Sequence, residues 1–503
     1  MNLARLAEEN VGRFGEYEAV LFGDRWHTNT EQLEGAHRFA GALVASGIRP
    51  GDRVAVMLPN ALEVFQIAGG TTAMGGVVVP VVFLLAPGEV RHILEDCRPK
   101  LFVTSPLFLD KAREAMEGLT EPPRLMVVGE PVPEGAESFT SATQASSPEF
   151  DIVDRDDHDV AVIMYTGGTT GRPKGVMLSH ENLRWNALTV ADAVQITPGQ
   201  MSLLALPVAH LFGMIASIIG QVIGTRGILL EWFTPDGVLQ AIQEHGVEYF
   251  PLVPTMMTLM LHQPDADQYD TSSLRTVFAS AAPLPIELAE AFEKKFDCEV
   301  LEAYGQTEAA PAIALMRPGL VKKAGSTGPP LPGVEVRIED DDHGPVEPGQ
   351  LGEICARSPG IMKGYHNLPD VTADTLGHGW LHTGDVGYLD EEGYLFVTDR
   401  KKDLIIRGGF NVYPRDIEDL LLEHRGVQEV AVVGRPDPQM GEEVVAFVVR
   451  SPGHEASEPD LLAFAAERLA KYKRPKEIVF TDVLPKSPIG KVLKKDLRAQ
   501  LTS

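Results

Sequence analysis

The sequence predicts an α/β protein with a large N-terminal domain, made of two α/β subdomains and a β-rich subdomain, and a small α+β C-terminal domain. Strand and helix signals alternate along the first three hundred or so residues, which is typical of largely parallel sheets. From Gly328 on, the sequence pattern changes: short strand signals are separated by turns that contain Gly, Pro and Asp. A compact tail then follows a basic run at residues 399–403.

The first α/β subdomain is predicted from periodicity and composition. Apolar residues recur at helical spacing from Leu33 to Leu43 and stop at Gly47. We expect further helices around residues 64–68 and at 87–96, and strands at 53–58, 77–79 and 101–103. The segment 121–159 is rich in Pro, Ser and acidic residues, so we expect it to be a surface connection.

The same alternation predicts the second α/β subdomain. Strands are expected at 203–206, 227–230, 249–253, 274–279 and 299–303, and helices at 235–245 and 285–296. The β-rich subdomain should contain strands at 333–338, 352–356 and 394–398.

The tail should contain helices at 414–422 and 459–469 and strands at 430–433, 443–449 and 477–480. These signals place the domains at 1–399 and 400–503. A solvated linker is the simplest interpretation of the basic run between them.

Composition excludes several classes of partner. The chain has 503 residues, and 44 basic against 71 acidic residues give a formal charge of −27, which disfavours nucleic acid and anionic lipid. The three cysteines show no metal or redox spacing, which predicts a reducing, cytoplasmic location. We expect no export signal, and no membrane segment because Gly, Pro and polar residues interrupt the apolar stretches at 67–87 and 203–230.

The segment 165–175 is the strongest candidate for a binding loop. It contains four glycines, three threonines and Lys174 directly after the apolar run 161–164. Glycine allows backbone N–H groups to surround an anion, and the hydroxyls and the lysine add donors. The spacing is not that of a Walker A loop, because Arg172 and Pro173 intervene. A nucleotide-phosphate loop is favoured over an ordinary flexible turn.

Three further motifs are weak when each is taken alone. The segment 304–308, Tyr-Gly-Gln-Thr-Glu, offers a ring for stacking, a hydroxyl for phosphate and a carboxylate for Mg²⁺. The segment 379–385 ends in a turn aspartate, which could bond ribose hydroxyls or merely its own backbone. The segment 485–491 carries Lys491 on a Pro/Gly loop, where a solvated lysine is the simpler interpretation.

Taken together with residues 400–403 and 408–414, these motifs closely resemble, in content and order, the adenylate-forming superfamily of acyl-CoA synthetases, luciferases and adenylation domains. The resemblance covers essentially the whole chain. It implies a large N-terminal domain, a mobile C-terminal domain, and ATP, Mg²⁺ and CoA as cofactor and cosubstrates.

The resemblance also implies roles for individual residues. The phosphate loop would comprise Thr166, Gly167, Gly168, Thr169, Thr170, Gly171 and Lys174. The adenine would lie against Ala281, Ala282, Pro283, Glu302, Ala303, Tyr304 and Gly305. Thr307 would contact the α-phosphate, Glu308 would bind Mg²⁺, and Asp385 and Arg400 would hold the ribose.

The remaining implied roles concern the chemistry and the second half-reaction. Lys491 would lie between the substrate carboxylate and the α-phosphate, and Lys402 would be the hinge. Gly408 and Gly409 would line a pantetheine tunnel. Two positions depart from the family's pattern: Gly167 replaces a Ser or Thr, and Ala281 replaces a common Gly. We expect looser pyrophosphate contacts and a slightly narrower pocket rather than lost function.

By the same resemblance, residues 206–213 and 251–257 would line the acyl pocket. They contain no Lys or Arg, which disfavours a dicarboxylate and favours a fatty or aryl acid. Met256, Met257 and Met260 could adapt to varied ligands or simply form core. His210 could gate the pocket, contact the carboxylate or be structural.

An acyl-CoA synthetase that works through acyl-AMP is therefore the predicted function. The cluster Lys471, Lys473, Arg474 and Lys476 could hold the CoA phosphates, or be solvated charge. The alternative is an acyl-AMP ligase that loads a carrier protein. A non-catalytic relative is disfavoured by the retained charged residues, and a homodimer is left open.

Overall fold

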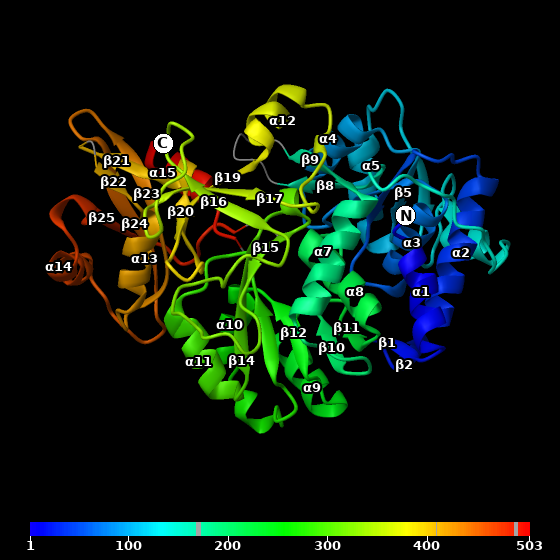
Figure 1. The fold of residues 1–503 in the computed structure, drawn as a ribbon, viewed down its shortest axis with the longest axis horizontal. Coiled ribbons are helices and arrows are strands. Elements are labelled where there is room, and N and C mark those ends of the chain that lie inside the picture. Colours follow the sequence, from blue (N-terminus) through cyan, green and yellow to red (C-terminus); the bar gives the residue numbers. More distant parts are fainter. Residues whose placement is uncertain (167–172, 409, 487–490, 503) are drawn as a thin grey trace.

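The computed structural model describes residues 1–166, 173–408, 410–486 and 491–502. Two large mixed α/β units, a small β-sheet and a C-terminal α+β domain surround a central cleft (Figure 1). The C-terminal domain, orange to red, lies on the opposite side of the molecule from the blue N-terminal unit. This arrangement confirms the predicted fold class.

The first sheet is mostly parallel, with an antiparallel edge formed by β8, β9 and β18. Its strands, in spatial order, are β18 (Gly364–Tyr365), β9 (Lys174–Ser179), β8 (Val160–Thr166), β4 (Val77–Pro80), β3 (Arg53–Met57), β5 (Leu101–Thr104), β6 (Arg124–Val127) and β7 (Glu137–Ser138). The helices of this unit are α1 (Arg5–Phe14), α2 (Asn29–Ala45), α3 (Leu62–Ala73), α4 (Pro87–Cys97), α5 (Leu109–Met116), α6 (Phe139–Gln144) and α7 (His180–Ala193), with the short turn η1 (Pro106–Phe108).

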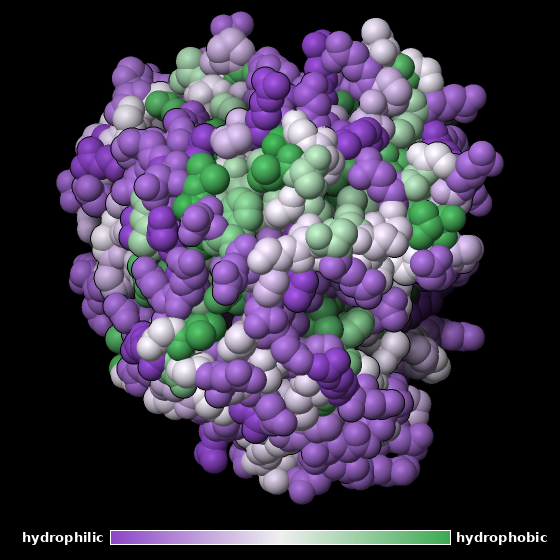
Figure 2. All heavy atoms as spheres, turned by 90° about the vertical axis from the view of Figure 1, so that its right-hand side faces the viewer, coloured by the Kyte–Doolittle hydropathy of each residue, from purple (hydrophilic) through white to green (hydrophobic). Residues whose placement is uncertain are grey.

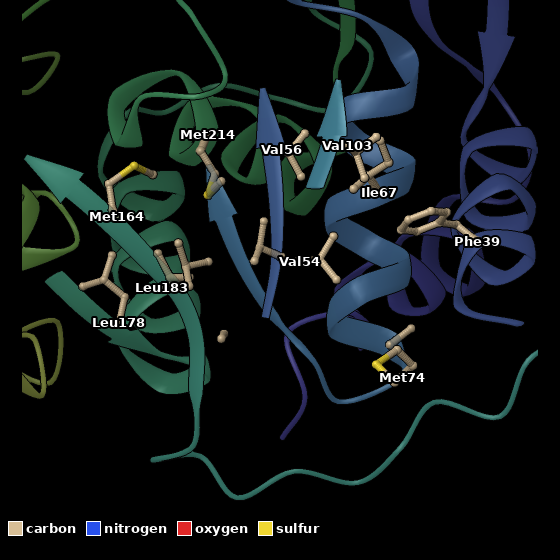
Figure 3. Close-up of a cluster of buried hydrophobic side chains, with 14 of the residues drawn as sticks. Phe39, Val54, Val56, Ile67, Met74, Val103, Met164, Leu178, Leu183 and Met214 are labelled. Atoms are coloured by element: carbon tan, nitrogen blue, oxygen red, sulfur yellow. The ribbon is translucent and has the colours of Figure 1, made fainter. Parts of the chain in front are cut away.

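A continuous apolar core holds this unit together. Val54 and Val56 on β3 point toward Ile67 on α3, and Phe39 on α2 packs behind that helix (Figure 3). Phe39 and Ile67 are completely buried. Burying such a side chain contributes about 1.5–3 kcal/mol, so this core fixes the sheet whose loops reach the cleft.

One edge of the second sheet is formed by the hairpin β1–β2, which comes from the N-terminal part of the chain. In spatial order its strands are β15 (Ala312–Leu315), β14 (Glu299–Gly305), β13 (Thr276–Ala279), β12 (Tyr249–Leu252), β10 (Met201–Leu204), β11 (Arg226–Leu229), β1 (Glu18–Phe22) and β2 (Arg25–Thr28). Its helices are α8 (Leu211–Ile223), α9 (Pro235–His245), α10 (Pro254–Leu261) and α11 (Ile286–Phe296), with η2 (Ala266–Gln268) and η3 (Thr307–Ala309). Because β1 pairs with β11, residues some 200 positions apart in sequence share one sheet.

Asn60, which is buried, joins the two units. Its amide Nδ2 donates to the carbonyl oxygens of Leu206 at 2.9 Å and Leu230 at 3.0 Å, and its Oδ1 accepts from the Val208 N–H at 2.9 Å. Two backbone groups of the 206–213 segment and the carbonyl of Leu230 therefore depend on one side chain.

We expect Asn60→Ala to lower the free energy of unfolding by about 2–5 kcal/mol, because it leaves one N–H and two carbonyls without partners in the interior. Urea denaturation, monitored by tryptophan fluorescence, measures this loss. Asn411→Ala is the control. Asn411 is an exposed strand residue, so its replacement should change the free energy of unfolding little. Equal stability of both variants would contradict the role assigned to Asn60.

The small sheet lies between the units and the C-terminal domain. Its strands are antiparallel, in the order β16 (Glu335–Glu339), β17 (Gly352–Arg357), β19 (Leu381–Leu389) and β20 (Leu395–Arg400). The helical segments α12 (Pro369–Thr375) and η4 (Gly377–Gly379) precede β19, and η5 (Lys401–Asp403) follows β20.

The C-terminal domain is a five-stranded sheet with helices. The strands are β21 (Ile405–Arg407), β22 (Phe410–Val412), β23 (Val427–Asp437), β24 (Gly441–Arg450) and β25 (Glu477–Phe480). The helices are α13 (Pro414–Leu422), α14 (Glu458–Arg468), η6 (Lys471–Lys473) and α15 (Lys494–Thr502). Every element predicted for the tail is present. Both helices, β24 and β25 agree with the prediction within two residues, whereas β23 begins three residues before and ends four residues after the predicted 430–433.

One expectation was wrong. The segment 121–159 is more than a surface connection, because it supplies β6, β7 and α6, and its Met126, Val127 and Phe139 are buried. Residues 124–127 are apolar after the first position and pair with β5. The strand was not predicted because the surrounding segment is rich in Pro and acidic residues.

Figure 2 shows the face formed by the N-terminal unit. Hydrophilic side chains cover most of it, and apolar residues are grouped near the middle. Among the described residues, no helix combines the length and apolarity needed to cross a membrane.

Candidate active site

One cavity of about 1750 Å³ lies where the two units, the small sheet and the C-terminal domain meet. All the predicted site residues that the structure describes line it, except Gly408: Thr166, Lys174, His210, Ala281, Ala282, Pro283, Glu302, Ala303, Tyr304, Gly305, Thr307, Glu308, Asp385, Arg400, Lys402 and Lys491. Gly167, Gly168, Thr169, Thr170, Gly171 and Gly409 lie outside the described residues. Residues from distant motifs thus share one cavity.

A chain of contacts links Lys174, from the predicted phosphate loop, to Glu308, the predicted Mg²⁺ ligand. Lys174 Nζ lies 4.2 Å from the centre of the Tyr365 ring, a cation–π contact. The Tyr365 hydroxyl donates to Glu308 Oε1 at 2.8 Å, and Glu308 is buried in η3. Sequence reasoning missed Tyr365, because it belongs to none of the motifs and reaches the site only through pairing of β18 with β9.

A second network surrounds Asp385 on β19. Tyr304 donates its hydroxyl to Asp385 Oδ2 at 2.7 Å, and Arg400 Nε lies 3.2 Å from Asp385 Oδ1. Asp385 and Arg400 are also directly paired across β19 and β20. Burial and the nearby Asp385 raise the pKa of Tyr304 well above its usual value, so the phenol stays protonated and donates. The aspartate is therefore oriented before any ligand arrives.

The predicted adenine wall has a tightly specified backbone. Ala281 has a φ of +73°, in the left-handed region that favours glycine. Ser280 Oγ donates to the Ala303 carbonyl at 2.8 Å and so ties the wall to β14. A Cβ on Gly305 would lie 2.0 Å from the Pro311 carbonyl oxygen, so only glycine fits there.

His210 caps the N-terminus of α8. The Phe212 N–H donates to His210 Nδ1 at 3.3 Å, which leaves the proton of the neutral ring on Nε2. Burial, reinforced by Lys491, lowers the pKa of His210 to about 4. The side chain is therefore a neutral hydrogen-bond donor at the cavity, and it has a structural capping role as well.

Lys491 reaches the same cavity from the C-terminal domain. Burial, and then the nearby Arg400, lower the pKa of Lys491 to about 8. Below that pH the side chain is an ammonium ion, and above it the charge is lost.

From this pKa we expect kcat/KM for pyrophosphate formation to fall as the pH rises through about 8, because kcat/KM reports groups of the free enzyme. The pH profile of the Lys491→Arg variant tests the assignment, since a guanidinium stays charged throughout. If that variant is active, its alkaline limb should disappear. An identical limb in both proteins would assign the titration to another group.

Gly408 stands apart from the cavity. It has a φ of +58°, and its N–H donates to the Met440 carbonyl at 2.7 Å. It does not line the cavity in this arrangement of the domains, so its place in a pantetheine tunnel stays a prediction. The domain boundary at residue 399 likewise stays a prediction.

The site has the features of an enzyme that adenylates a carboxylate: a cleft between two domains, a lysine beside a glycine-rich segment, a buried glutamate and a second lysine from the smaller domain. Family models agree. Residues 7–366 match the AMP-binding enzyme family, and residues 416–491 match the AMP-binding enzyme C-terminal domain. The chain belongs to the AMP-binding enzyme family, as its motifs predicted.

Individual relatives match over nearly their full length. A long-chain-fatty-acid–CoA ligase of Bacillus subtilis is 36% identical over 99% of this chain and 94% of its own. A fatty acid–[acyl-carrier-protein] ligase of Streptomyces coeruleorubidus, ScoC, is 36% identical over 95% of this chain and 92% of its own. The structure of the anthranilate CoA ligase AuaEII in complex with anthranoyl-AMP matches with a TM-score of 0.94 at 27% identity, over 100% of this chain and 97% of the other.

Proposed function

We propose that this protein is an ATP-dependent acyl-CoA synthetase that activates an apolar carboxylic acid through acyl-AMP. The observation that carries the proposal is the meeting of Lys174, Glu308 and Lys491 in one cavity that also has apolar walls. Relatives named as CoA ligases of fatty and aryl acids support the same activity.

The central difficulty of this reaction is charge. A carboxylate oxygen attacks an α-phosphate that is itself negative, and pyrophosphate leaves with further negative charge. Lys491 and Lys174 offset this repulsion and stabilise charge that develops in the transition state. His210 is neutral and carries its proton on Nε2. It therefore orients the acid by a hydrogen bond and does not compete with Lys491 as a positive charge. Asp385 and Arg400 hold the ribose, so that reactants meet in one orientation.

Glu308 has the properties expected of a Mg²⁺ ligand. Mg²⁺ prefers oxygen donors and usually takes one or two carboxylates together with substrate phosphates, which a buried Glu beside Thr307 can provide. When bound, the ion supplies charge neutralisation on the phosphates. Tyr365 holds one oxygen of Glu308 and so fixes the direction of the other.

The acceptor thiol then attacks the carbonyl carbon of acyl-AMP and displaces AMP. The protein needs no cysteine nucleophile for this step, and Cys97, Cys298 and Cys355 are all buried. Burial raises the pKa of Cys97 and of Cys298 to about 12, so neither is a thiolate at neutral pH.

The acid is proposed to be fatty or aromatic. Apolar side chains form part of the cavity wall, among them Phe212, Ile215, Ile218 and Leu203. The methionines of the predicted pocket, Met256, Met257 and Met260, belong to the core of the second unit. An apolar tail is thus accommodated without burial of an unpaired charge.

Pyrophosphate and AMP release with ATP and Mg²⁺, across fatty acids of graded length and several aryl acids, tests the proposal. We expect turnover that requires CoA and peaks at one chain length or ring type. Acids with a second carboxylate should be poor substrates. Pyrophosphate release that is strongest for dicarboxylates would contradict the proposed substrate class.

Loading of a carrier protein is the second candidate, supported by the similarity to ScoC. The basic cluster proposed for CoA is partly engaged within the domain, because Lys473 pairs with Asp416 at 2.6 Å and Lys476 with Glu443 at 3.2 Å. If acyl-AMP forms and a phosphopantetheinylated carrier protein discharges it, while CoA does not, this second candidate is favoured.

A cytoplasmic location and a homodimer remain part of the proposal.

A further inference from the structure

A second group of potential metal ligands lies in and beside the small sheet, and one of its members, His382, also lines the cavity. Glu339 ends β16, His343 lies on the turn that follows it, and His382 is the second residue of β19. One oxygen of the carboxylate and one nitrogen of each imidazole all lie within 4.8 Å of one another. None of the sequence motifs drew attention to the three as a set.

Glu339 is the central member of this group. Its side chain is only 1% exposed. Its Oε2 lies 3.4 Å from His343 Nδ1 and 3.8 Å from His382 Nδ1. Arg337 makes an ion pair with Oε1, yet neither oxygen has a properly directed hydrogen bond within the described part of the chain. Buried carboxylates are normally hydrogen-bonded or bound to a metal, and Oε2, the oxygen that the ion pair with Arg337 leaves available, lies near both imidazole rings.

Two more donors stand next to His382. Cys355 Sγ on β17 lies 3.4 Å from His382 Nδ1, and Glu353 Oε2 lies 3.8 Å from the same nitrogen. The thiol is completely buried. A sulfur, two imidazoles and a carboxylate are the donor types that suit zinc and similar transition-metal ions, whereas Mg²⁺ prefers oxygen alone.

We propose that Glu339, His343 and His382 bind a divalent transition-metal ion of the zinc class, with Cys355 next to the fourth coordination position. In tetrahedral zinc sites with bonds of about 2.1 Å, neighbouring ligand atoms are roughly 3.4 Å apart. The contacts around Glu339 Oε2 already approach this spacing. His343 is 55% exposed on a turn, so its ring can close the remaining gap.

The position of this site links it to the cleft. Glu353, next to His382, accepts a hydrogen bond from the Gly384 N–H at 3.0 Å, and Asp385 follows directly. Lys401 Nζ lies 3.3 Å from the other oxygen of Glu353. A bound ion would therefore fix the part of β19 that presents Asp385.

Metal binding by the full-length protein tests the proposal directly. After removal of metal with a chelator, Zn²⁺ affinity is measured by competition with a chromogenic chelator, and Mg²⁺ serves as the comparison ion. We expect one zinc ion per chain, and at least a tenfold to hundredfold weaker affinity in His343→Asn and in Glu339→Gln, because loss of a ligand costs no less than loss of an outer-shell partner. His454→Asn, which alters an exposed histidine of the C-terminal domain, is the control and should bind as the wild type does.

His343→Asn keeps the test decisive if Glu339→Gln fails to fold. His343 is exposed and has a φ of +61°, which asparagine tolerates. Substitution with Co²⁺ adds a spectroscopic readout, since a thiolate-to-cobalt band that disappears in Cys355→Ser would identify the fourth ligand. No stoichiometric zinc in the wild type, or undiminished affinity in His343→Asn, would overturn the proposal and leave a histidine–carboxylate ion pair.

Discussion

Lys491→Ala is expected to lower the rate of acyl-AMP formation by at least about 10²–10³-fold, because it removes a charge placed where the transition state becomes more negative. The structure places Lys491 in the same cavity as His210, Thr307 and Asp385, although it comes from the other domain. Thioester formation from acyl-AMP supplied ready-made should stay close to the wild-type rate, because the repulsion between carboxylate and phosphate is already overcome.

Two assays on one variant separate these steps. Pyrophosphate release reports adenylation, and discharge of synthetic acyl-AMP by CoA reports thioester formation. Lys322→Ala, which removes a lysine paired with Glu293 at the surface, is the control for loss of one positive charge. An equal loss in both half-reactions would show that Lys491 acts structurally rather than in adenylation alone.

Glu308→Gln should lower adenylation to a similar degree, about 10²-fold or more, since it replaces the anionic ligand expected for Mg²⁺ by a neutral amide. The side chain is buried and is similar in size to its replacement, so folding should be retained. The dependence of the rate on Mg²⁺ concentration is the informative measurement. We expect the half-saturating Mg²⁺ concentration to rise together with the loss of rate.

Tyr365→Phe provides the matched comparison. It removes the 2.8 Å hydrogen bond to Glu308 Oε1 but keeps both the carboxylate and the ring on which Lys174 lies. This variant should therefore lose far less activity than Glu308→Gln. An unchanged Mg²⁺ dependence in Glu308→Gln would contradict the metal-ligand role and leave Glu308 as an anchor for Tyr365.

The sequence predicted those parts of the fold that depend on local patterns. Helix α13 was expected at 414–422 and spans Pro414–Leu422, because a proline starts it and an apolar face continues it. Non-local pairing was not predictable in this way. The contact between β1 and β11, and the return of β18 to the first sheet, join residues about 200 positions apart and leave no local signal.

The same division applies to the candidate site. Motif residues such as Asp385 and Lys491 could be named from the sequence, since each belongs to a short motif that contains Gly or Pro and that the family shares. Tyr365 could not, because its role arises from strand pairing. The group around Glu339 also escaped notice, since His343 and His382 come together only when β16 and β19 fold into one sheet.

The most direct test of the proposed chemistry follows the oxygen atoms of the acid. A substrate labelled with ¹⁸O in both carboxylate oxygens is turned over with ATP, Mg²⁺ and CoA, and the products are analysed by mass spectrometry. If the carboxylate attacks the α-phosphate, AMP must leave with one labelled oxygen and pyrophosphate with none. Label in pyrophosphate or inorganic phosphate, or its absence from AMP during active turnover, would contradict an acyl-AMP intermediate and with it the function proposed for this cleft.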